Sequence, residues 1–331
     1  MSIRRVFASP LAPTLARYLA WKESLGCQYT LERSVLQSLD RFLAALDGAD
    51  LDGKTFAAWC LTQERLTRGV QRNRRRIVRN FCLYRRRHKP DCFVPDPLLF
   101  PAPHQPRSPY IFSESELSKL IGQAALLSRT SNSPLRPEVF RLALVLLYTT
   151  GLRRGELVRL TVGDYDDHAR TLLIRTTKFH KSRILPLPQD VAREIQCYLQ
   201  ARRRYQPVLR AEMPLLWHRK SEDGYTGTGI REGLCRLMRR AGIRKVDGRL
   251  PRVHDLRHSF AVNALLRWYQ AGVDVETKLP FLATYMGHVS ILSTYHYLHF
   301  VQPLRVEASL RFAQSCGKLI RPLEPVEGTR S

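Results

Sequence analysis

Residues able to do chemistry gather in four separated stretches of the sequence. They are TGLRRGEL (150–157), TKFHKSRILPL (177–187), HDLRHSF (254–260) and YMGHVSILSTYHYLH (285–299). Taken alone, each has an ordinary interpretation, such as a surface arginine, a lysine at a hairpin tip, or a histidine pair that forms a polar stripe or binds a metal. Taken together, they supply guanidinium groups for phosphate oxygens, a lysine to protonate a departing oxygen, histidines that act near neutral pH, and nucleophilic tyrosines. The combination predicts transfer chemistry at a phosphorus centre.

The spacing within the third stretch supports this prediction. His254 and Arg257 are three residues apart, so on a helix they share a face and can contact one phosphate. A tyrosine has an ordinary pKa of about 10, and clustered cations favour its phenolate and stabilise charge that develops on phosphorus. The sequence has neither an HExxH motif nor the paired carboxylates expected of a two-metal nuclease. Because guanidinium groups supply the positive charge, we expect no metal and no cofactor.

The four stretches, in this order, resemble the tyrosine recombinases, also called the phage integrase family. The resemblance covers about residues 110 to 300 and implies a catalytic set of Arg153, Lys178, His254, Arg257, His288 and Tyr297. The tyrosine lies nine residues after the histidine of the Gly-His pair and is followed by Leu298 and His299, similar to the Tyr-x-His ending of the family.

Three neighbouring residues need separate interpretations. Tyr295 and Tyr297 are two positions apart and would point about 200° apart on a helix, so we expect only one to enter the site. The resemblance selects Tyr297 and leaves Tyr295 as a packing or positioning residue. Lys178 and Lys181 are both close on the hairpin, and the family position near the start of the turn favours Lys178. Glu156 follows Arg153 by one turn and is expected to orient it.

The resemblance also implies a mechanism. Tyr297 would attack a DNA phosphodiester to form a 3′-phosphotyrosyl link, and the 5′-hydroxyl would leave with a proton from Lys178. The other arginines and histidines would hold the non-bridging oxygens until a second 5′-hydroxyl rejoins the strand, without ATP. Strand exchange needs one tyrosine for each strand cut, which implies a homo-tetramer, or a hetero-tetramer with related recombinases, on double-stranded DNA.

Other functions are compatible with parts of this pattern. A type IB topoisomerase uses similar chemistry without a tetramer, and a non-catalytic DNA-binding protein would not need all six reactive positions. Among recombinases, the stretch LPFLATYMGH and the basic chain favour service to a mobile genetic element over the resolution of chromosome dimers.

Composition indicates the same partner. The chain has 331 residues, 54 Lys and Arg against 29 acids, and a formal net charge of +25. Such an excess predicts binding to nucleic acid. We find no apolar run long enough to span a membrane and expect no membrane partner. The seven cysteines are scattered without a CxxC pair, which is typical of reduced thiols, so we expect a cytoplasmic protein.

The elements that must position these residues are mainly helical. Residues 10–89 show the three-and-four spacing of amphipathic helices, and the stretch from Arg65 to Lys89 holds eleven basic residues and no acid. We expect this stretch to contact phosphates, through Arg68, Arg72, Arg74, Arg75, Arg76, Arg79, Arg85, Arg86 and Arg87. The sequence GADLDGKT (48–55) matches a phosphate-loop pattern, but it follows a helix and carries two aspartates, so we interpret it as a turn between helices.

Later elements complete the predicted fold. A capping box at Ser113 opens the second domain, and TLLIRTT and SRILPLP form a β-hairpin. Helices are expected over 188–205, 228–242, 254–270, 277–286, 290–298 and about 303–316. The last could dock on a neighbouring subunit or on its own domain.

The predicted fold class is therefore mainly α with a small antiparallel sheet. By resemblance, it comprises a SAM-like helical DNA-binding domain and a tyrosine recombinase catalytic domain. The expected segments are a helical domain (1–95), a proline-rich linker (96–111), the catalytic domain (112–302) and a C-terminal helix and tail (303–331).

Overall fold

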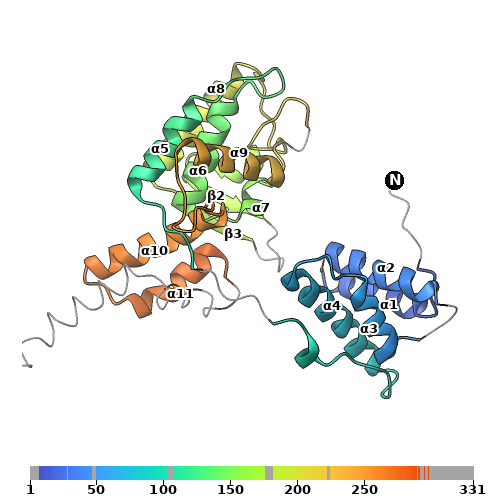
Figure 1. Cartoon of the computed structure of the whole chain (residues 1–331). Coiled ribbons are helices and arrows are strands. Elements are labelled where there is room, and N and C mark those ends of the chain that lie inside the picture. Colours follow the sequence, from blue (N-terminus) through green and yellow to red (C-terminus); the bar gives the residue numbers. More distant parts are fainter. Residues whose placement is uncertain are drawn as a thin grey trace, which may run out of the picture. The chain divides into compact units, whose positions relative to one another are not determined.

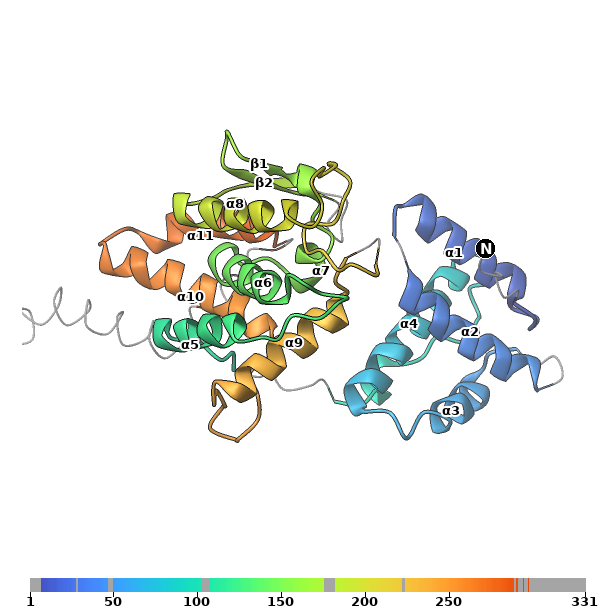
Figure 2. The same ribbon diagram turned by 90° about the horizontal axis from the view of Figure 1, so that it is seen from above.

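The chain forms two compact units, Met1–Arg107 and Ser108–Ser331. The computed structural model describes residues 7–27, 29–46, 50–102, 108–175, 182–221, 224–288, 290, 294 and 297 (Figures 1 and 2). Several predicted features lie outside these residues: Lys178 with its neighbour Lys181, Tyr295, all of the predicted helix at 290–298 except residues 290, 294 and 297, and the C-terminal helix at 303–316. Within the described part of the chain, no helix has the length and apolar character needed to cross a bilayer.

The first unit is built from helices. They are α1 (Ala12–Ser24), α2 (Thr30–Ala44), α3 (Gly53–Leu61) and α4 (Arg68–Arg86), followed by the short 3-10 turn η1 (Pro97–Leu99). Its core joins the apolar faces of all four helices and includes Leu36, Trp59 and Phe81. Phe100 also packs in this core, so the expected linker begins with residues that belong to the first unit.

The phosphate-loop pattern lies between two helices. Asp52 caps α3: its side chain accepts from the Thr55 backbone N–H at 2.7 Å, and the Thr55 hydroxyl accepts from the Asp52 N–H at 2.8 Å. The element before it is α2, whereas a phosphate loop would follow a strand. The structure therefore confirms the interpretation as a turn between helices.

The second unit is a helical bundle with a small sheet. Its elements are α5 (Glu114–Ala125), α6 (Arg136–Thr150), α7 (Arg154–Leu157), η2 (Val162–Asp164), β1 (Tyr165–Asp166), β2 (Thr171–Ile174), β3 (Arg183–Pro186), α8 (Gln189–Arg203), α9 (Gly227–Arg240), α10 (His254–Gln270) and α11 (Val275–Met286). The strands pair antiparallel in the order β1-β2-β3. The predicted fold class, a mainly α protein with a small antiparallel sheet, is confirmed, as are the hairpin and the Ser113 capping box.

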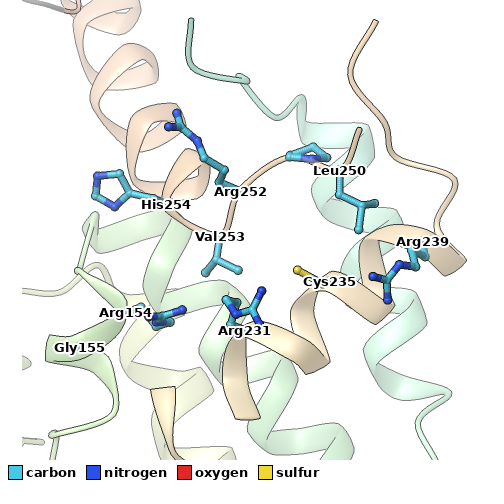
Figure 3. Close-up of a pocket in the computed structure, with 10 residues that line it drawn as sticks. Arg154, Gly155, Arg231, Cys235, Arg239, Leu250, Arg252, Val253 and His254 are labelled. Carbon is cyan, nitrogen blue, oxygen red and sulfur yellow. The ribbon is translucent and has the colours of Figure 1, made fainter. Parts of the chain in front are cut away.

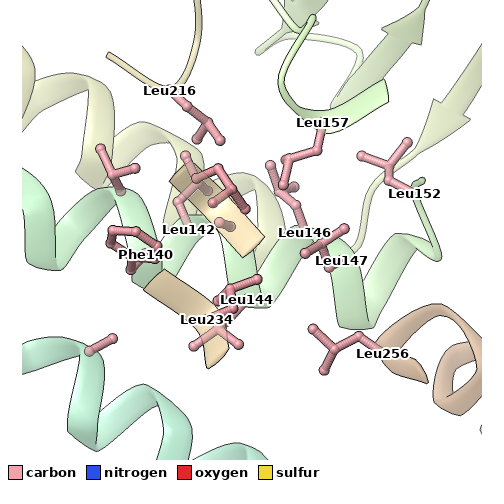
Figure 4. Packing of buried hydrophobic residues seen from close by; sticks show 14 of the residues in the cluster. Phe140, Leu142, Leu144, Leu146, Leu147, Leu152, Leu157, Leu216, Leu234 and Leu256 are labelled. Carbon is pink, nitrogen blue, oxygen red and sulfur yellow. The ribbon is translucent and has the colours of Figure 1, made fainter. Parts of the chain in front are cut away.

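Helix α6 lies at the centre of the second unit. It is apolar around most of its circumference and packs against α5, α8, α9 and α10. Figure 4 shows Phe140, Leu142 and Leu144 of this helix among leucines from other elements. A separate apolar cluster joins α10 to α11 and includes Tyr297. These two cores hold the ends of α6, α10 and α11 in place, and the candidate catalytic residues lie at those ends.

Candidate active site

A left-handed turn at the end of α6 places the first arginine. Gly151 has φ +62°, and a Cβ at this position would lie 2.5 Å from Cδ1 of Phe260. Only glycine fits this conformation and this contact well. Arg153 follows as the N-cap of α7, while Arg257 in the first turn of α10 donates to the Gly151 carbonyl. The turn therefore brings two distant arginines to one place.

Two backbone carbonyls in the turn after α11 accept hydrogen bonds from the same two arginines, Arg153 and Arg257. Gly287 has φ +68° and ends the helix. Arg257 donates through Nη2 to the carbonyl of Met286 at 2.7 Å, and Arg153 donates through Nη2 to that of Gly287 at 2.8 Å. His288, the next residue, is thereby fixed beside the two guanidinium groups. Its Nδ1 lies 2.8 Å from the hydroxyl oxygen of Thr294.

Glu156 is the buried anion of this cluster. One carboxylate oxygen accepts from Nη1 of Arg153 at 2.8 Å, and Arg183 of β3 donates to both oxygens at 3.2 and 2.9 Å. Burial alone would raise the pKa of Glu156, but hydrogen bonds from Arg183 and Arg153 lower it to about 2. The carboxylate therefore stays ionised, and its contacts suit the predicted role of orienting Arg153.

Arg183 was missed at the level of sequence. Besides its contacts to Glu156, it donates through Nε to the carbonyl of Tyr285 at 2.8 Å. It pairs with Ile174 at the end of the described β2–β3 ladder and is the first residue of β3. The first residue of β3 is thus anchored to the same cluster as Arg153. Arg183 lies within the stretch TKFHKSRILPL, but sequence reasoning assigned it no role, because its partners Glu156 and Tyr285 belong to the distant elements α7 and α11.

Three histidines lie in this electropositive surrounding. Burial and, next in size, the charge of nearby Arg257 together lower the pKa of His254 and of His288 to about 4. Burial and His254 lower the pKa of His258 to about 3. All three imidazoles are therefore neutral at pH 7, and each presents one N–H donor and one acceptor nitrogen.

Tyr297 lies within reach of these groups. Only 3% of the residue is exposed. Its ring stacks near that of His288 with centroids 6.5 Å apart, and its hydroxyl oxygen lies 2.9 Å from Nδ1 of His258. Burial raises the pKa of Tyr297, whereas Arg257 and Arg153 lower it. Burial outweighs the two arginines, so the pKa of Tyr297 lies above its ordinary value and the phenol is protonated in the free protein, whereas the sequence analysis expected the cations to favour the phenolate.

The structure therefore brings five of the six predicted catalytic residues together: Arg153, His254, Arg257, His288 and Tyr297. His258 is an additional residue that contacts the candidate nucleophile. Sequence reasoning saw it only as the partner of His254 in a polar stripe or metal pair. Its position one turn after His254, on the same helix face, was the available signal.

A basic pocket adjoins His254. It has a volume of about 560 Å³ and is lined by residues of α7, α9 and the segment before α10 (Figure 3). Four arginines and no carboxylate line it: Arg154, Arg231, Arg239 and Arg252. Sequence analysis predicted the helix but not this pocket, although Arg231 and Arg239 are spaced to share one face of α9.

The arginines of α4 do not share one environment. With about 100° per residue, Arg74 and Arg85 fall on the side opposite most of the others. Arg85 is 6% exposed and bonds to Asp50, and Arg74 lies 5.8 Å from the ring centroid of Trp59. These two were predicted to contact DNA. They instead face the core of the first unit, and the contradiction is clearest for the buried Arg85.

Three further arginines hold the segment that follows α4. Arg72, Arg75 and Arg79 donate to the backbone carbonyls of Pro101, Leu99 and Pro95 at 2.7, 3.3 and 3.2 Å. Such bonds use only part of a guanidinium, so contact with phosphate remains open to each. Among the predicted DNA contacts, the exposed ones are Arg68, Arg76, Arg86 and Arg87.

A family model, two related sequences and a solved structure, all of integrases or recombinases, match this chain. The model of the phage integrase family matches residues 117–302. A candidate integrase/recombinase of Sinorhizobium fredii, y4rB, is 32% identical over 305 residues, covering 92% of this chain and 97% of that protein. The tyrosine recombinase XerA of Pyrococcus furiosus is 33% identical over 157 residues, covering 47% and 49%. A structure of the Tn1549 transposon integrase with transposon right-end DNA has the same fold, with TM-score 0.62, 17% identity, and coverage of 91% of this chain and 98% of that one.

Proposed function

Because the chain belongs to the phage integrase family, we propose that its chemistry is carried by Tyr297 as the nucleophile of DNA strand cleavage. The chain is a tyrosine recombinase, an enzyme that breaks and rejoins DNA in site-specific recombination. The observation that supports Tyr297 is its position, in contact with the neutral His258 and His288 and close enough to Arg153 and Arg257 for their charges to act on it.

The proposed roles follow from charge and hydrogen-bonding capacity. Arg153 and Arg257 bind the non-bridging oxygens of the scissile phosphate and stabilise the charge that grows on them. His254 and His288, being neutral, each donate one N–H to the same group. Lys178 gives a proton to the 5′-oxygen as it leaves. The step forms the bond between Tyr297 Oη and phosphorus and breaks the bond to the 5′-oxygen.

Rejoining reverses this sequence with a different 5′-hydroxyl. The incoming hydroxyl loses its proton to the deprotonated lysine and attacks the phosphotyrosyl phosphorus. Tyr297 leaves and regains its proton. One phosphodiester is broken and one is formed, and this balance explains why the proposal needs no ATP, while Arg153 and Arg257 supply the positive charge at the phosphate.

The DNA duplex needs cationic contacts on both units. We assign one contact region to the pocket lined by Arg154, Arg231, Arg239 and Arg252, because it adjoins His254 and four arginines line it against no carboxylate, although Arg231 and Arg252 pair with Glu232 and Asp255 beside it. On the first unit, the exposed arginines of α4 are the proposed phosphate contacts. Both regions neutralise phosphates without requiring a particular base, so they contribute affinity that falls with salt.

A mobile-element role and a tetrameric assembly on DNA complete the proposal. The match to y4rB spans nearly the whole chain, whereas the match to XerA spans about half of it. This difference supports a likeness to proteins named integrase/recombinase, and the stretch LPFLATYMGH with the strongly basic chain supports a role in a mobile element over the resolution of chromosome dimers. Exchange between two duplexes requires a tyrosine for each strand cut, so we propose a tetramer on two sites.

The test uses the full chain and duplex fragments from the DNA that flanks its gene. Covalent adducts are trapped with SDS and resolved on a denaturing gel. The wild type and Tyr295→Phe should form an adduct, while Tyr297→Phe should bind the same fragments and form none. An adduct with Tyr297→Phe but not with Tyr295→Phe would show that the assigned nucleophile is wrong.

The assembly is tested separately with mass photometry. When the wild type is mixed with a duplex fragment on which it forms an adduct, it should give a complex with the mass of four chains and two duplexes. Relaxation of supercoiled DNA by single chains, with no paired complex, would instead indicate a topoisomerase-like reaction.

A further inference from the structure

The residue closest to the chemistry that the proposed mechanism does not use is His258. It lies in α10, one turn after His254, and the two rings meet edge to face with centroids 4.7 Å apart. Its Nδ1 lies 2.9 Å from the hydroxyl oxygen of Tyr297, a hydrogen-bond distance, and the two ring centroids are 5.4 Å apart. His258 is thus a titratable side chain in direct contact with the atom that must attack phosphorus.

The protonation state of His258 decides which atom of this contact donates the hydrogen bond and which accepts it. Because its pKa is lowered to about 3 by burial and by His254, the imidazole is neutral at pH 7. A neutral imidazole carries one N–H and one lone pair. When the proton resides on Nε2, the lone pair of Nδ1 faces Tyr297 and accepts its O–H. This is the arrangement that proton removal from a phenol requires.

We propose that His258 is the general base that takes the proton of Tyr297 as the phenolic oxygen attacks the scissile phosphate. The inference rests on the proposed role of Tyr297. In the step, the O–H bond of Tyr297 breaks and its proton moves to Nδ1 of His258. The new bond joins Tyr297 Oη to phosphorus, and the 5′-oxygen leaves with a proton from Lys178. During rejoining, His258 returns its proton to the departing phenolate.

The charges around His258 make its pKa, and so its strength as a base, depend on whether DNA is bound. The groups that act on it are His254, Asp255 and Arg257 of α10, Arg252 before this helix, and Tyr297 itself. In the absence of DNA, burial and the cations favour the neutral imidazole. A phosphodiester bound by the two catalytic arginines adds negative charge beside the ring, which raises the pKa of a histidine. The proton transfer thus becomes easier once the substrate is in place.

A second role for the contact is purely geometric, in which His258 only orients the phenol. The two roles separate in His258→Asn, because the asparagine amide occupies the place of Cγ and Nδ1 and can bond to the tyrosine but cannot take a proton. The matched control is His218→Asn. His218 also contacts a tyrosine in the second unit, Tyr225, with ring centroids 5.2 Å apart, outside the active site.

The experiment measures single-turnover adduct formation by the full chain on a captured duplex fragment. We expect His258→Asn and His258→Ala to react about 100-fold more slowly or worse, the range found for loss of a general base. Added imidazole should restore part of the rate of His258→Ala. DNA affinity should be unchanged in both variants, which shows that they fold, and His218→Asn should react like the wild type.

The measured rates distinguish the general-base role of His258 from the proposed role of Tyr297 as the nucleophile. A wild-type rate for His258→Asn, together with a slow His258→Ala, would show that the contact only orients Tyr297 and would overturn the general-base role. Wild-type rates for both would remove His258 from the reaction altogether. A wild-type chain that forms no adduct, or a Tyr297→Phe variant that forms one, would refute the proposed function itself.

Discussion

Glu156→Gln is the substitution whose effect follows most directly from the structure. The carboxylate is almost fully buried, with 2% of its side chain exposed, and it bonds to Arg153 and to Arg183. Glutamine keeps the size and one carbonyl acceptor but removes the negative charge. Two guanidinium groups would then lie side by side without their shared anion. We therefore expect a lower free energy of unfolding and a misplaced Arg153.

The magnitude follows from the pKa of Glu156. This pKa is lowered from 4.5 to about 2 in the folded chain. A pKa difference of that size corresponds to about 3 kcal/mol, because one unit is worth about 1.4 kcal/mol. Removal of one partner from a buried ion pair costs about 3–5 kcal/mol in general. The two values agree, since a glutamine resembles a protonated glutamate in charge and shape.

The sign of the pH dependence provides a second check. A carboxyl whose pKa is lower in the folded state stabilises the fold fully above its unfolded pKa, and this contribution is lost as pH falls toward the folded pKa. The difference between the wild type and Glu156→Gln should therefore be constant above about pH 5.5 and fall to about half near pH 3. The histidines contribute equally to the pH dependence of the unfolding free energy in both proteins, so their contribution cancels in the difference.

The assay is urea unfolding of the full chain, followed by circular dichroism, at pH 7 and at lower pH. Glu194→Gln is the matched control: Glu194 accepts two hydrogen bonds from Arg141 in the same unit, but that arginine is 45% exposed. An exposed pair of this kind contributes about 0–1 kcal/mol. A loss below 1 kcal/mol for Glu156→Gln, or a loss that does not change with pH, would refute this account of the cluster.

Three further predictions follow. Arg76→Ala and Arg86→Ala should each reduce the slope of log affinity against log salt by about 0.9, equally on all DNA sequences, and a changed site preference with the same slope would contradict phosphate contact. Because the pKa values of the three site histidines lie below their ordinary value, stability in urea should fall as pH drops below about 6.5; unchanged stability between pH 7.5 and 5 would count against their burial. Gly287→Ala should lose about 1–2 kcal/mol and slow adduct formation, because φ is positive there and Arg183 lies close; wild-type stability in urea would contradict this.

Much of the fold and chemistry of this protein is encoded locally. The sequence predicted a helix over residues 254–270, and the structure has α10 at His254–Gln270. The Ser113 capping box and the β2–β3 hairpin depend on neighbouring residues and were equally predictable. The resemblance of four motifs, in their order, to a known family indicated recombinase chemistry. The helix, the cap and the hairpin are accessible because helix periodicity, capping and turn formation act over a few residues.

The tertiary structure decided which side chains meet. Arg183 reaches Glu156 from a strand, and His258 meets Tyr297 across 39 positions of the chain. The sequence shows how many arginines α4 contains, but only the packing shows that Arg85 is buried and bonded to Asp50. Periodicity defines the faces of a helix, whereas the partner of each face comes from a distant segment. Burial then sets the pKa of each group through what surrounds it, so the protonation states of the site arise only when the chain has folded.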